Sequence, residues 1–488
     1  MLISFVGNER VDQITMKYIT PLLLLLICFG CTDSAKKNAE GIAYFGGEII
    51  NPTDDFVLLY YKGDLVDSLK LDNDNRFLVK LKNHKNGLYK FSHNREHQYI
   101  TIEEGDSLLL RLNTYTFDES LFFTGKGAEK NNFYIELFLL NENEERPVYQ
   151  YTRLNSDDFS QKMDSLQAIK LNKQEKFLIN NPNVSKEYKN FIDKVIRYQN
   201  FSYNETYQNM FNVRRRKDST LTINTSFYDY KKEVNMNDST MSYYVPYTRY
   251  IMQFINNSSY SECLKKSWKG ENELNTSLTY NKNKLKLIDS LVTYPYLRNE
   301  LLRYTAYSYF RDNTSDMEKN NEFFKLYQKI ATDLESKEEI SNLHEGIKNL
   351  QAGNNFSNSI YVYDDTHNRL PISRLSSNRA KTILYFWTSK QLRHKRLITE
   401  KIKVLAKEFP NLNIVGISLD TDHKSWKKAI KELEFPRSKQ YRVGDKNNLL
   451  KDFALININK LIITDRNGYI MNAFANIYNT DLRDQLKK

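Results

Sequence analysis

The chain contains three cysteines, Cys28, Cys31 and Cys263, which are the residues best suited to nucleophilic, redox or metal chemistry. Cys28 and Cys31 close an apolar run near the N-terminus, whereas Cys263 stands alone far along the chain. A lone cysteine is more often a small buried hydrophobic residue than a reactive group. We therefore expect Cys263 to be a free thiol with a structural role.

Two histidines, His93 and His97, have the i, i+4 spacing that would place both imidazoles on one face of a helix, as in metal-binding pairs. Their surroundings instead resemble a strand-rich loop, and no glutamate follows His93 directly. Solvated surface histidines are therefore the favoured interpretation. No metal and no other cofactor is predicted.

The run Gly105-Asp106-Ser107-Leu108 matches the nucleophile motif of GDSL esterases, and Asp420 and His423 have the Asp-x-x-His spacing that could complete a triad. The serine, however, belongs to a turn in a β-rich region rather than to a strand-to-helix elbow, and the histidine lies in another segment. A catalytic triad is defined by the spatial arrangement of its side chains and not by a match in sequence letters, so a hydrolase is not favoured.

A basic cluster marks the expected start of a helix near residue 391, where cations oppose the helix dipole. Basic side chains beside free amide groups can also hold an anion, so a phosphate or lipid headgroup is one interpretation and a solvated basic face the other. The cluster contains Lys390, Arg393, His394, Lys395 and Arg396. The candidate groove or anion site is formed by Trp387, Lys390, Gln391, Arg393, His394 and Asn459.

Composition and charge limit the class of protein. The 488 residues are 40% hydrophobic and 13% aromatic, which is enough for two or three domains with substantial cores. The formal charge is +11, but the 71 basic and 60 acidic residues are interleaved without an extended basic tail. This pattern indicates a solvated basic surface, and nucleic acid is not an expected partner.

The segment from Met16 onward has the short charged start and the apolar run of a secretory signal, and it is too short to span a bilayer comfortably. Residues 1–15 are polar and do not belong in such a signal, so Met16 is the expected start. We predict an N-terminal extension and signal peptide over residues 1–31 and a polar tether over residues 32–40.

The end of the apolar run, Cys28-Phe29-Gly30-Cys31, resembles the lipobox of bacterial lipoproteins, in which the cysteine is acylated and becomes the first residue. The resemblance implies that Cys31 is the lipid anchor. It places the protein in the bacterial cell envelope, with the outer membrane favoured and the periplasm or the outside as the side it faces. Cys263 would then be the single remaining thiol, so no intramolecular disulfide would form. An ordinary export signal that contains cysteines is the alternative.

Three further regions lead to the C-terminal domain. Residues 41–127 alternate short apolar runs with turn signals such as Asn86-Gly87, which predicts a small antiparallel β-sandwich. Residues 128–350 space their apolar side chains as helices do, so this region is expected to be mostly α-helical. The segment 351–358 is the expected linker.

Residues 359–488 alternate strand and helix patterns, which is an α/β order. Strands are expected at 360–363, 382–387 and 413–418, and helices at 391–408 and 425–433. A hairpin is expected from Lys460 to Met471, with its turn at Asp465-Arg466-Asn467-Gly468, and a last helix near Asp481.

This pattern resembles the TlpA-like thioredoxin family of envelope disulfide reductases. The resemblance lies in residues 370–373, in residues 381–389 with their Phe386-Trp387-Thr388-Ser389 end, in residues 415–420 with Trp426, and in the hairpin residues 462–468. More weakly, Glu103–Ser107 and Gly125-Lys126-Gly127 resemble the β-rich domain of unknown function that precedes a thioredoxin domain in some envelope lipoproteins.

In that family a Cys-x-x-Cys motif opens the helix after the Phe-Trp-Ala-Ser strand, and the corresponding residues here are Gln391-Leu392-Arg393-His394. Neither Gln391 nor His394 can form a mixed disulfide. Asn459 occupies the position of the family's cis-proline, and a cis bond before asparagine would cost about 2.5–4 kcal/mol, so a trans peptide is expected. The resemblance thus implies the fold with a degenerate active site and no catalytic residue.

These observations predict a membrane-anchored envelope lipoprotein with a β-sandwich, a helical middle region and a C-terminal α/β thioredoxin-like domain. We expect the thioredoxin-like domain to be redox-inactive and to act in binding or assembly of an envelope protein or peptide. The alternative is a TlpA-like thiol-disulfide oxidoreductase that works through a non-standard cysteine or a partner. A third hypothesis is a lipoprotein that binds a polysaccharide or small ligand on its β-sandwich.

Overall fold

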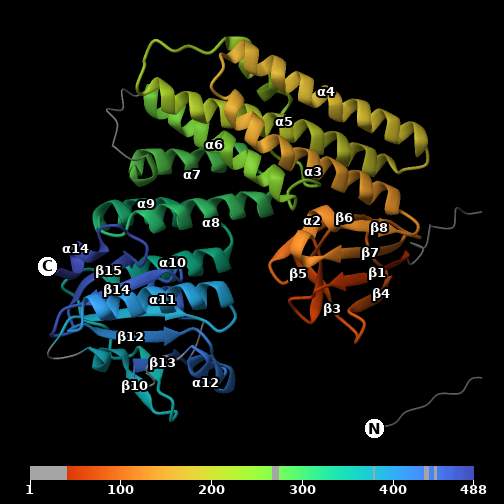
Figure 1. The fold of residues 1–488 in the computed structure, drawn as a ribbon. Coiled ribbons are helices and arrows are strands. Elements are labelled where there is room, and N and C mark those ends of the chain that lie inside the picture. Colours follow the sequence, from red (N-terminus) through yellow and green to blue (C-terminus); the bar gives the residue numbers. More distant parts are fainter. Residues whose placement is uncertain (1–40, 266–273, 377–379, 434–438, 445–447, 488) are drawn as a thin grey trace, which may run out of the picture. The chain divides into compact units, whose positions relative to one another are not determined.

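The computed structural model describes residues 41–265, 274–376, 380–433, 439–444 and 448–487 (Figure 1). The predicted signal peptide, the lipobox with Cys31 and the tether lie outside the described residues. The chain forms two compact units. One contains the residues up to Glu145 together with Ile169–Asp193, and the other contains Arg146–Ala168 together with the residues from Lys194 onward.

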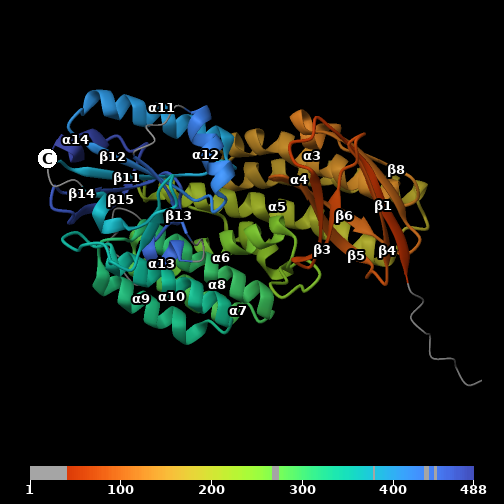
Figure 2. The same ribbon diagram turned by 90° about the horizontal axis from the view of Figure 1, so that it is seen from below.

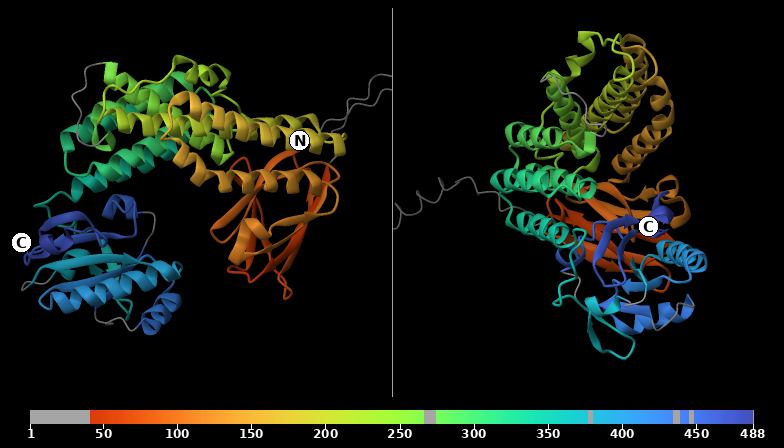
Figure 3. Two further views of the ribbon diagram at one scale, coloured as in Figure 1. Left: turned by 45° about the horizontal axis from the view of Figure 1, so that its top comes forward. Right: turned by 90° about the vertical axis from the view of Figure 1, so that its left-hand side faces the viewer.

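The N-terminal strands form two four-stranded sheets, which agrees with the predicted β-sandwich (Figure 3). One sheet has the order β4-β1-β7-β8 and the other the order β3-β2-β5-β6. The pairing of β1 with β7 is parallel, so the expectation of a wholly antiparallel sandwich is wrong at this position. The strands are β1 Ile42–Ile50, β2 Phe56–Tyr61, β3 Asp64–Lys70, β4 Arg76–Lys82, β5 Gly87–His93, β6 Glu96–Ile102, β7 Ser107–Asn113 and β8 Phe122–Thr124.

Alternation along the strands builds the core between the two sheets. Phe45 on β1 and Phe91 on β5 are fully buried, and their ring centroids lie 5.9 Å apart across the sandwich. Alternate residues of β1 point to opposite faces, so Ala43, Phe45 and Ile49 turn inward while Ile42 and Tyr44 remain exposed. Burial of these side chains is the main force that holds the two sheets together.

The middle of the chain is helical, as predicted. Several helices begin at side chains that accept hydrogen bonds from the first turn, such as Asp316 before α9 and Asp333 before α10. Within the described residues, no helix combines the length and the hydropathy needed to cross a bilayer. The helices are α2 Phe117–Ser120, α3 Ala128–Tyr151, α4 Ser156–Asn180, α5 Lys186–Arg215, α6 Val245–Lys265, α7 Leu278–Leu291, α8 Pro295–Asp312, α9 Met317–Ile330 and α10 Leu334–Asn349, with 3-10 turns at Thr114–Thr116, Thr225–Glu233 and Leu274–Thr276.

The C-terminal domain is built on a seven-stranded mixed sheet with the order β10-β9-β13-β12-β11-β14-β15. Helix α11 covers one face of this sheet, and α13 together with α10 lies on the other (Figure 2). Strands β11, β12 and β13 are parallel, and β14 joins β11 antiparallel. The elements are β9 Tyr361–Tyr363, β10 Arg369–Pro371, a 3-10 turn Ile372–Leu375, β11 Thr382–Trp387, α11 Leu392–Glu408, β12 Asn413–Ser418, α12 His423–Glu432, β13 Gln440–Val443, α13 Leu449–Phe453, β14 Lys460–Thr464, β15 Ile470–Asn476 and α14 Leu482–Lys487.

The core of this domain places two aromatic side chains, Trp387 and Tyr385, around the amide of Gln440. Trp387 Nε1 donates to Gln440 Oε1 at 3.1 Å, and Gln440 Nε2 donates to the Tyr385 hydroxyl at 2.9 Å. Gly416 on β12 makes this approach possible, because a Cβ there would lie 2.2 Å from Gln440 Oε1. A small residue is therefore required at this point of the sheet.

The expected linker is tied to the C-terminal hairpin. The Gly353 N–H donates to the Ile470 carbonyl at 2.8 Å, and the Ile470 N–H donates to the Asn354 carbonyl at 2.8 Å. Asn355 forms an isolated antiparallel bridge with Tyr469. These bonds fix the segment that leads from α10 into the C-terminal domain.

Candidate functional site

The helix start predicted to replace the Cys-x-x-Cys motif lies at the end of a fully buried strand. All six residues of β11 are buried, and α11 begins at Leu392 directly after Gln391. The Gln391 side chain makes no capping hydrogen bond, while its carbonyl accepts from the Lys395 N–H at 2.8 Å. The Gln391 side-chain amide is therefore not used to cap the helix.

Asp420 fixes the loop between β11 and α11. Its buried carboxylate accepts hydrogen bonds from Thr388 Oγ1 at 2.7 Å, from the Ser389 N–H at 2.7 Å and from Ser418 Oγ at 2.9 Å. Three donors on one carboxylate hold the backbone that leads to Gln391 in one position. Asp420 is thus a positioning residue. This structural role explains why an aspartate stands in the Asp-x-x-His pattern.

The structure brings His394 and Asn459 together. Both side chains are half-buried, and Asn459 is close enough to the imidazole to affect its pKa, although neither ring nitrogen has a hydrogen-bond partner among the described residues. Burial lowers the pKa of His394, and the interaction with Asn459 partly opposes this effect. The neutral form of the imidazole is therefore favoured. The two positions that the sequence comparison placed opposite one another are neighbours in the fold.

The loop that carries Asn459 is held by a buried lysine. Lys460 Nζ donates to the carbonyls of Phe453 and Ala454, at 2.5 Å and 3.2 Å, and lies 4.3 Å from the centre of the Phe474 ring. Burial lowers the pKa of Lys460 well below its usual range. The structure has no cis peptide bond in its described residues, so the peptide before Asn459 is trans, as expected.

Two of the aromatic and basic residues assigned to this region are structural. Trp387 is fully buried, so it supports the site from beneath. Lys395 is also buried and forms an ion pair with Glu432 at 3.5 Å, so it is not part of a basic surface, contrary to the sequence interpretation. Lys390, Arg393 and Arg396 are exposed, and the apolar side chain of Leu392 is 61% exposed between them.

The other candidate residues have structural roles. His93 is buried rather than solvated, which corrects the prediction: its Nε2 accepts from the Thr53 N–H at 3.0 Å and its Nδ1 donates to the Phe56 carbonyl at 3.0 Å. These bonds tie β5 to the turn before β2. His97 is exposed on β6. Cys263 is a buried free thiol, as predicted.

The Gly-Asp-Ser-Leu motif forms a buried ion-pair cluster. Lys130 Nζ lies 2.8 Å from Asp106 Oδ2 and 2.5 Å from Glu103 Oε2. Asp106 Oδ2 also accepts from the Glu103 N–H at 2.7 Å, and a Cβ at Gly127 would lie 2.3 Å from Asp106 Oδ1. The cluster therefore anchors α3 to the sandwich, and this packing accounts for the residues that resemble a nucleophile motif.

The candidate site offers hydrogen-bonding and apolar side chains. Among the described residues, no group of three or more His, Cys, Asp or Glu side chains is placed to hold a metal ion. The sequence from residue 264 onward contains no cysteine, so the helix start offers two amides, a neutral imidazole and an exposed leucine. These groups can donate and accept hydrogen bonds and can pack against apolar surface.

Residues 379–470 match the model of a family described as thioredoxin-like, so the C-terminal α/β domain is thioredoxin-like. Similar solved structures include a thiol-disulfide oxidoreductase from Bacteroides fragilis, with 24% identity, a TM-score of 0.23 and coverage of 28% of this chain and 97% of that one. The thioredoxin domain of a thiol-disulfide oxidoreductase from Bacteroides vulgatus has 20% identity, a TM-score of 0.23 and coverage of 28% and 95%. A thiol:disulfide interchange protein from Bacteroides sp. has 20% identity, a TM-score of 0.22 and coverage of 25% and 80%. No curated protein matches the chain.

Proposed function

We propose that the thioredoxin-like domain binds an extended segment of another envelope protein at the surface around Gln391, His394 and Asn459, without exchanging covalent bonds with it. The placement of His394, at the start of α11, beside the loop that carries Asn459 carries this proposal. It keeps the helix start and the loop adjacent, as in the active site of the family that the sequence resembles, while neither side chain can attack a disulfide.

The side chains at this surface suit a polypeptide backbone. The amides of Gln391 and Asn459 each donate and accept, which matches the alternating N–H and C=O groups of an extended chain. The exposed Leu392 can bury an apolar side chain of the partner. The exposed cations Lys390, Arg393 and Arg396 favour a segment with acidic residues over one with basic residues.

We further propose that the protein is a lipoprotein of the bacterial cell envelope, anchored through Cys31. The support is the resemblance of Cys28-Phe29-Gly30-Cys31 to a lipobox after an apolar run. Anchoring holds the binding domain near the membrane. The partner is then another component of the envelope.

The redox alternative needs an accessible thiol. Cys263 is fully buried, and its Sγ lies 3.5 Å from the Asn283 side-chain amide. A partner's disulfide could reach this sulfur only after local unfolding, so burial does not favour exchange through Cys263. No specific observation favours polysaccharide binding on the sandwich.

The binding proposal is tested with a thiol-blocked polypeptide and the full chain. The probe is fluorescein-labelled, carboxymethylated insulin B chain, and binding is followed by fluorescence anisotropy. Leu392→Asp should weaken binding about tenfold, because burying a leucine contributes about 1.5–3 kcal/mol. Leu397→Asp is the matched control, since Leu397 lies on the same helix and is 47% exposed. Equal affinities for the two variants, or no binding by the natural protein, would contradict the proposal.

A further inference from the structure

Helix α8 borders two cavities that meet along its surface. One has a volume of about 710 Å³ and the other about 520 Å³. Tyr296 and Glu300 line both cavities, so the two adjoin one another. We call these two adjoining cavities the α8 groove. It is separate from the surface around His394, and the inference drawn from it does not depend on the proposed function.

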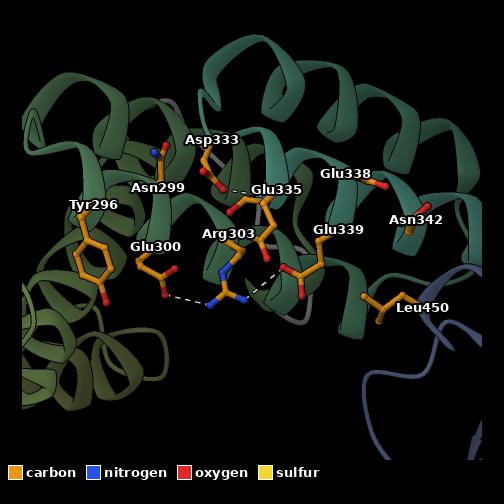
Figure 4. Close-up of a pocket in the computed structure, with 11 residues that line it drawn as sticks. Tyr296, Asn299, Glu300, Arg303, Asp333, Glu335, Glu338, Glu339, Asn342 and Leu450 are labelled. Atoms are coloured by element: carbon orange, nitrogen blue, oxygen red, sulfur yellow. Dashed lines mark hydrogen bonds and ion pairs between the residues drawn. The ribbon is translucent and has the colours of Figure 1, made fainter. Parts of the chain in front are cut away.

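The larger part of the groove is strongly acidic (Figure 4). Arg303 is the single cation among its lining residues, and it already pairs with Glu300 at 3.0 Å and with Glu339 at 3.4 Å. The exposed carboxylates of Glu335 and Glu338 have no cationic partner among the described residues. The acidic lining consists of Glu300, Asp333, Glu335, Glu338 and Glu339.

Helix stability explains only part of this charge. Asp333 caps α10 by accepting from the Ser336 N–H at 2.8 Å, and Glu335 lies in the first turn, where the helix dipole favours a negative charge. Glu338 and Glu339 follow beyond that turn, and Glu300 comes from α8. The whole chain carries a formal charge of +11, so this concentration of carboxylates does not follow from the composition.

The smaller part of the groove is aromatic and mainly apolar. The rings of Tyr243 and Tyr296 are stacked with centroids 4.0 Å apart and an angle of 24° between their planes. Tyr304, two turns after Tyr296 on α8, is 60% exposed. Leu301 and Met252 add apolar surface, and Arg249 is the cation of this part. Stacked tyrosines offer a flat apolar face next to the acidic part.

We infer that the α8 groove binds a cationic polypeptide segment in which an aromatic residue lies next to lysines or arginines. The uncompensated carboxylates of Glu335 and Glu338 complement the basic side chains, and the stacked tyrosines receive the aromatic ring. A ligand with charge alone would leave the tyrosine part unused, and a neutral aromatic ligand would leave the carboxylates unpaired. The two parts together therefore select both features in one segment.

The test measures binding of a fluorescein-labelled peptide, Gly-Lys-Arg-Trp-Lys-Gly, to the full chain by anisotropy at low salt. Three comparison probes are a peptide with glutamate in place of each basic residue, a peptide with alanine in place of tryptophan, and spermine as a competitor. The double variant Glu335→Gln/Glu338→Gln removes the two unpaired charges. The control Glu318→Gln/Asp484→Asn removes the same total charge from exposed positions outside the groove.

We expect the groove variant to bind the basic peptide about tenfold more weakly, the control to bind it within about twofold, and the alanine peptide to bind several-fold more weakly. Added salt should weaken the natural interaction, since the carboxylates are exposed. Equal binding by the groove variant and the control, or equal binding of the acidic peptide, would overturn the inference. If spermine displaced the basic peptide, and the peptide with alanine in place of tryptophan bound as tightly as the tryptophan peptide, the assignment of a polypeptide ligand would be overturned.

Discussion

Two buried lysines stabilise regions that the sequence analysis singles out. One region contains the Gly-Asp-Ser-Leu motif, and the other is the loop with Asn459. Lys130 neutralises Asp106 and Glu103 beneath the sandwich, and Lys460 holds the loop that carries Asn459. They differ in their partners, because Lys130 has two carboxylates and Lys460 has backbone carbonyls and an aromatic ring. This difference leads to different predictions for the two residues.

Replacing Lys130 should be costly, because it leaves the buried Asp106 and the partly buried Glu103 without a counter-charge. We expect Lys130→Met to lower the free energy of unfolding of the N-terminal unit by about 3–5 kcal/mol. Lys173→Met is the control: Lys173 pairs with Glu136 at 2.6 Å, but both side chains are exposed, and the loss should stay below about 1 kcal/mol. Hydrogen exchange at β6 and β7 in rising urea measures both values. Equal losses would contradict the account of this cluster.

Lys460 should make stability depend on pH. Its pKa is lowered in the folded state, so the unfolded chain binds more protons between the folded pKa and the ordinary value near 10.4, and stability rises with pH in that range. The penalty is fully present below the folded pKa and disappears as the pH rises through that interval. Relative to Lys460→Met, the natural protein should therefore gain thermal stability from pH 7 to pH 9.5. A constant difference in Tm would show that the amine is not desolvated.

At the scale of elements, the loop between β11 and α11 depends on one carboxylate. Asp420→Ala leaves the Ser389 N–H and two hydroxyl groups without their acceptor, and we expect a loss of about 3 kcal/mol in the stability of the C-terminal unit. Asp420→Asn keeps one acceptor oxygen and should lose less. Urea unfolding followed by tryptophan fluorescence measures this, since Trp387 and Trp426 lie in that core. A loss below 1 kcal/mol for the alanine variant would contradict this role.

Elements with a strong local pattern could be predicted from the sequence. Strands 382–387 and 413–418 were expected at the residues where β11 and β12 lie, because continuous apolar runs indicate strands buried on both faces. Strand β13, Gln440–Val443, was not expected, because it is short and polar and its place is set by pairing with β12 and β9. Its sequence alone carries no strand signal.

The candidate site was predicted in part. The neighbouring positions of His394 and Asn459 follow from the resemblance to the TlpA-like thioredoxin family, and not from any pattern in the residues alone. The burial of Lys395 could be predicted from the sequence. Lys395, Ile398 and Ile402 have i, i+3 and i+7 spacing, which places all three on the inner face of α11. The burial of His93 could not be predicted from its local sequence, because its hydrogen-bond partners Thr53 and Phe56 are distant in sequence.

The α8 groove could not be predicted from the sequence. Its two parts arise only when α6, α8 and α10 pack together. No local pattern in any one of these helices marks a cavity.

At the scale of the whole molecule, the proposed lipid anchor at Cys31 has a direct test. Cells that express the protein and are grown with radioactive palmitate should yield a labelled band for the natural chain and none for Cys31→Ser. Several acyl chains hold a protein firmly because each buried methylene contributes about 0.8 kcal/mol, so the variant should also leave the membrane fraction. Retained label in the variant would contradict the assignment of Cys31.

The central claim is that this thioredoxin-like domain acts without thiol exchange, and an insulin-reduction assay tests it most directly. The natural chain is compared with a variant that carries Gln391→Cys and His394→Cys. Our account predicts that the natural protein is inactive and that the variant gains reductase activity, because the fold already places these positions at the helix start beside Asn459. Reduction of insulin by the natural protein would contradict the claim and make Cys263 the residue to explain.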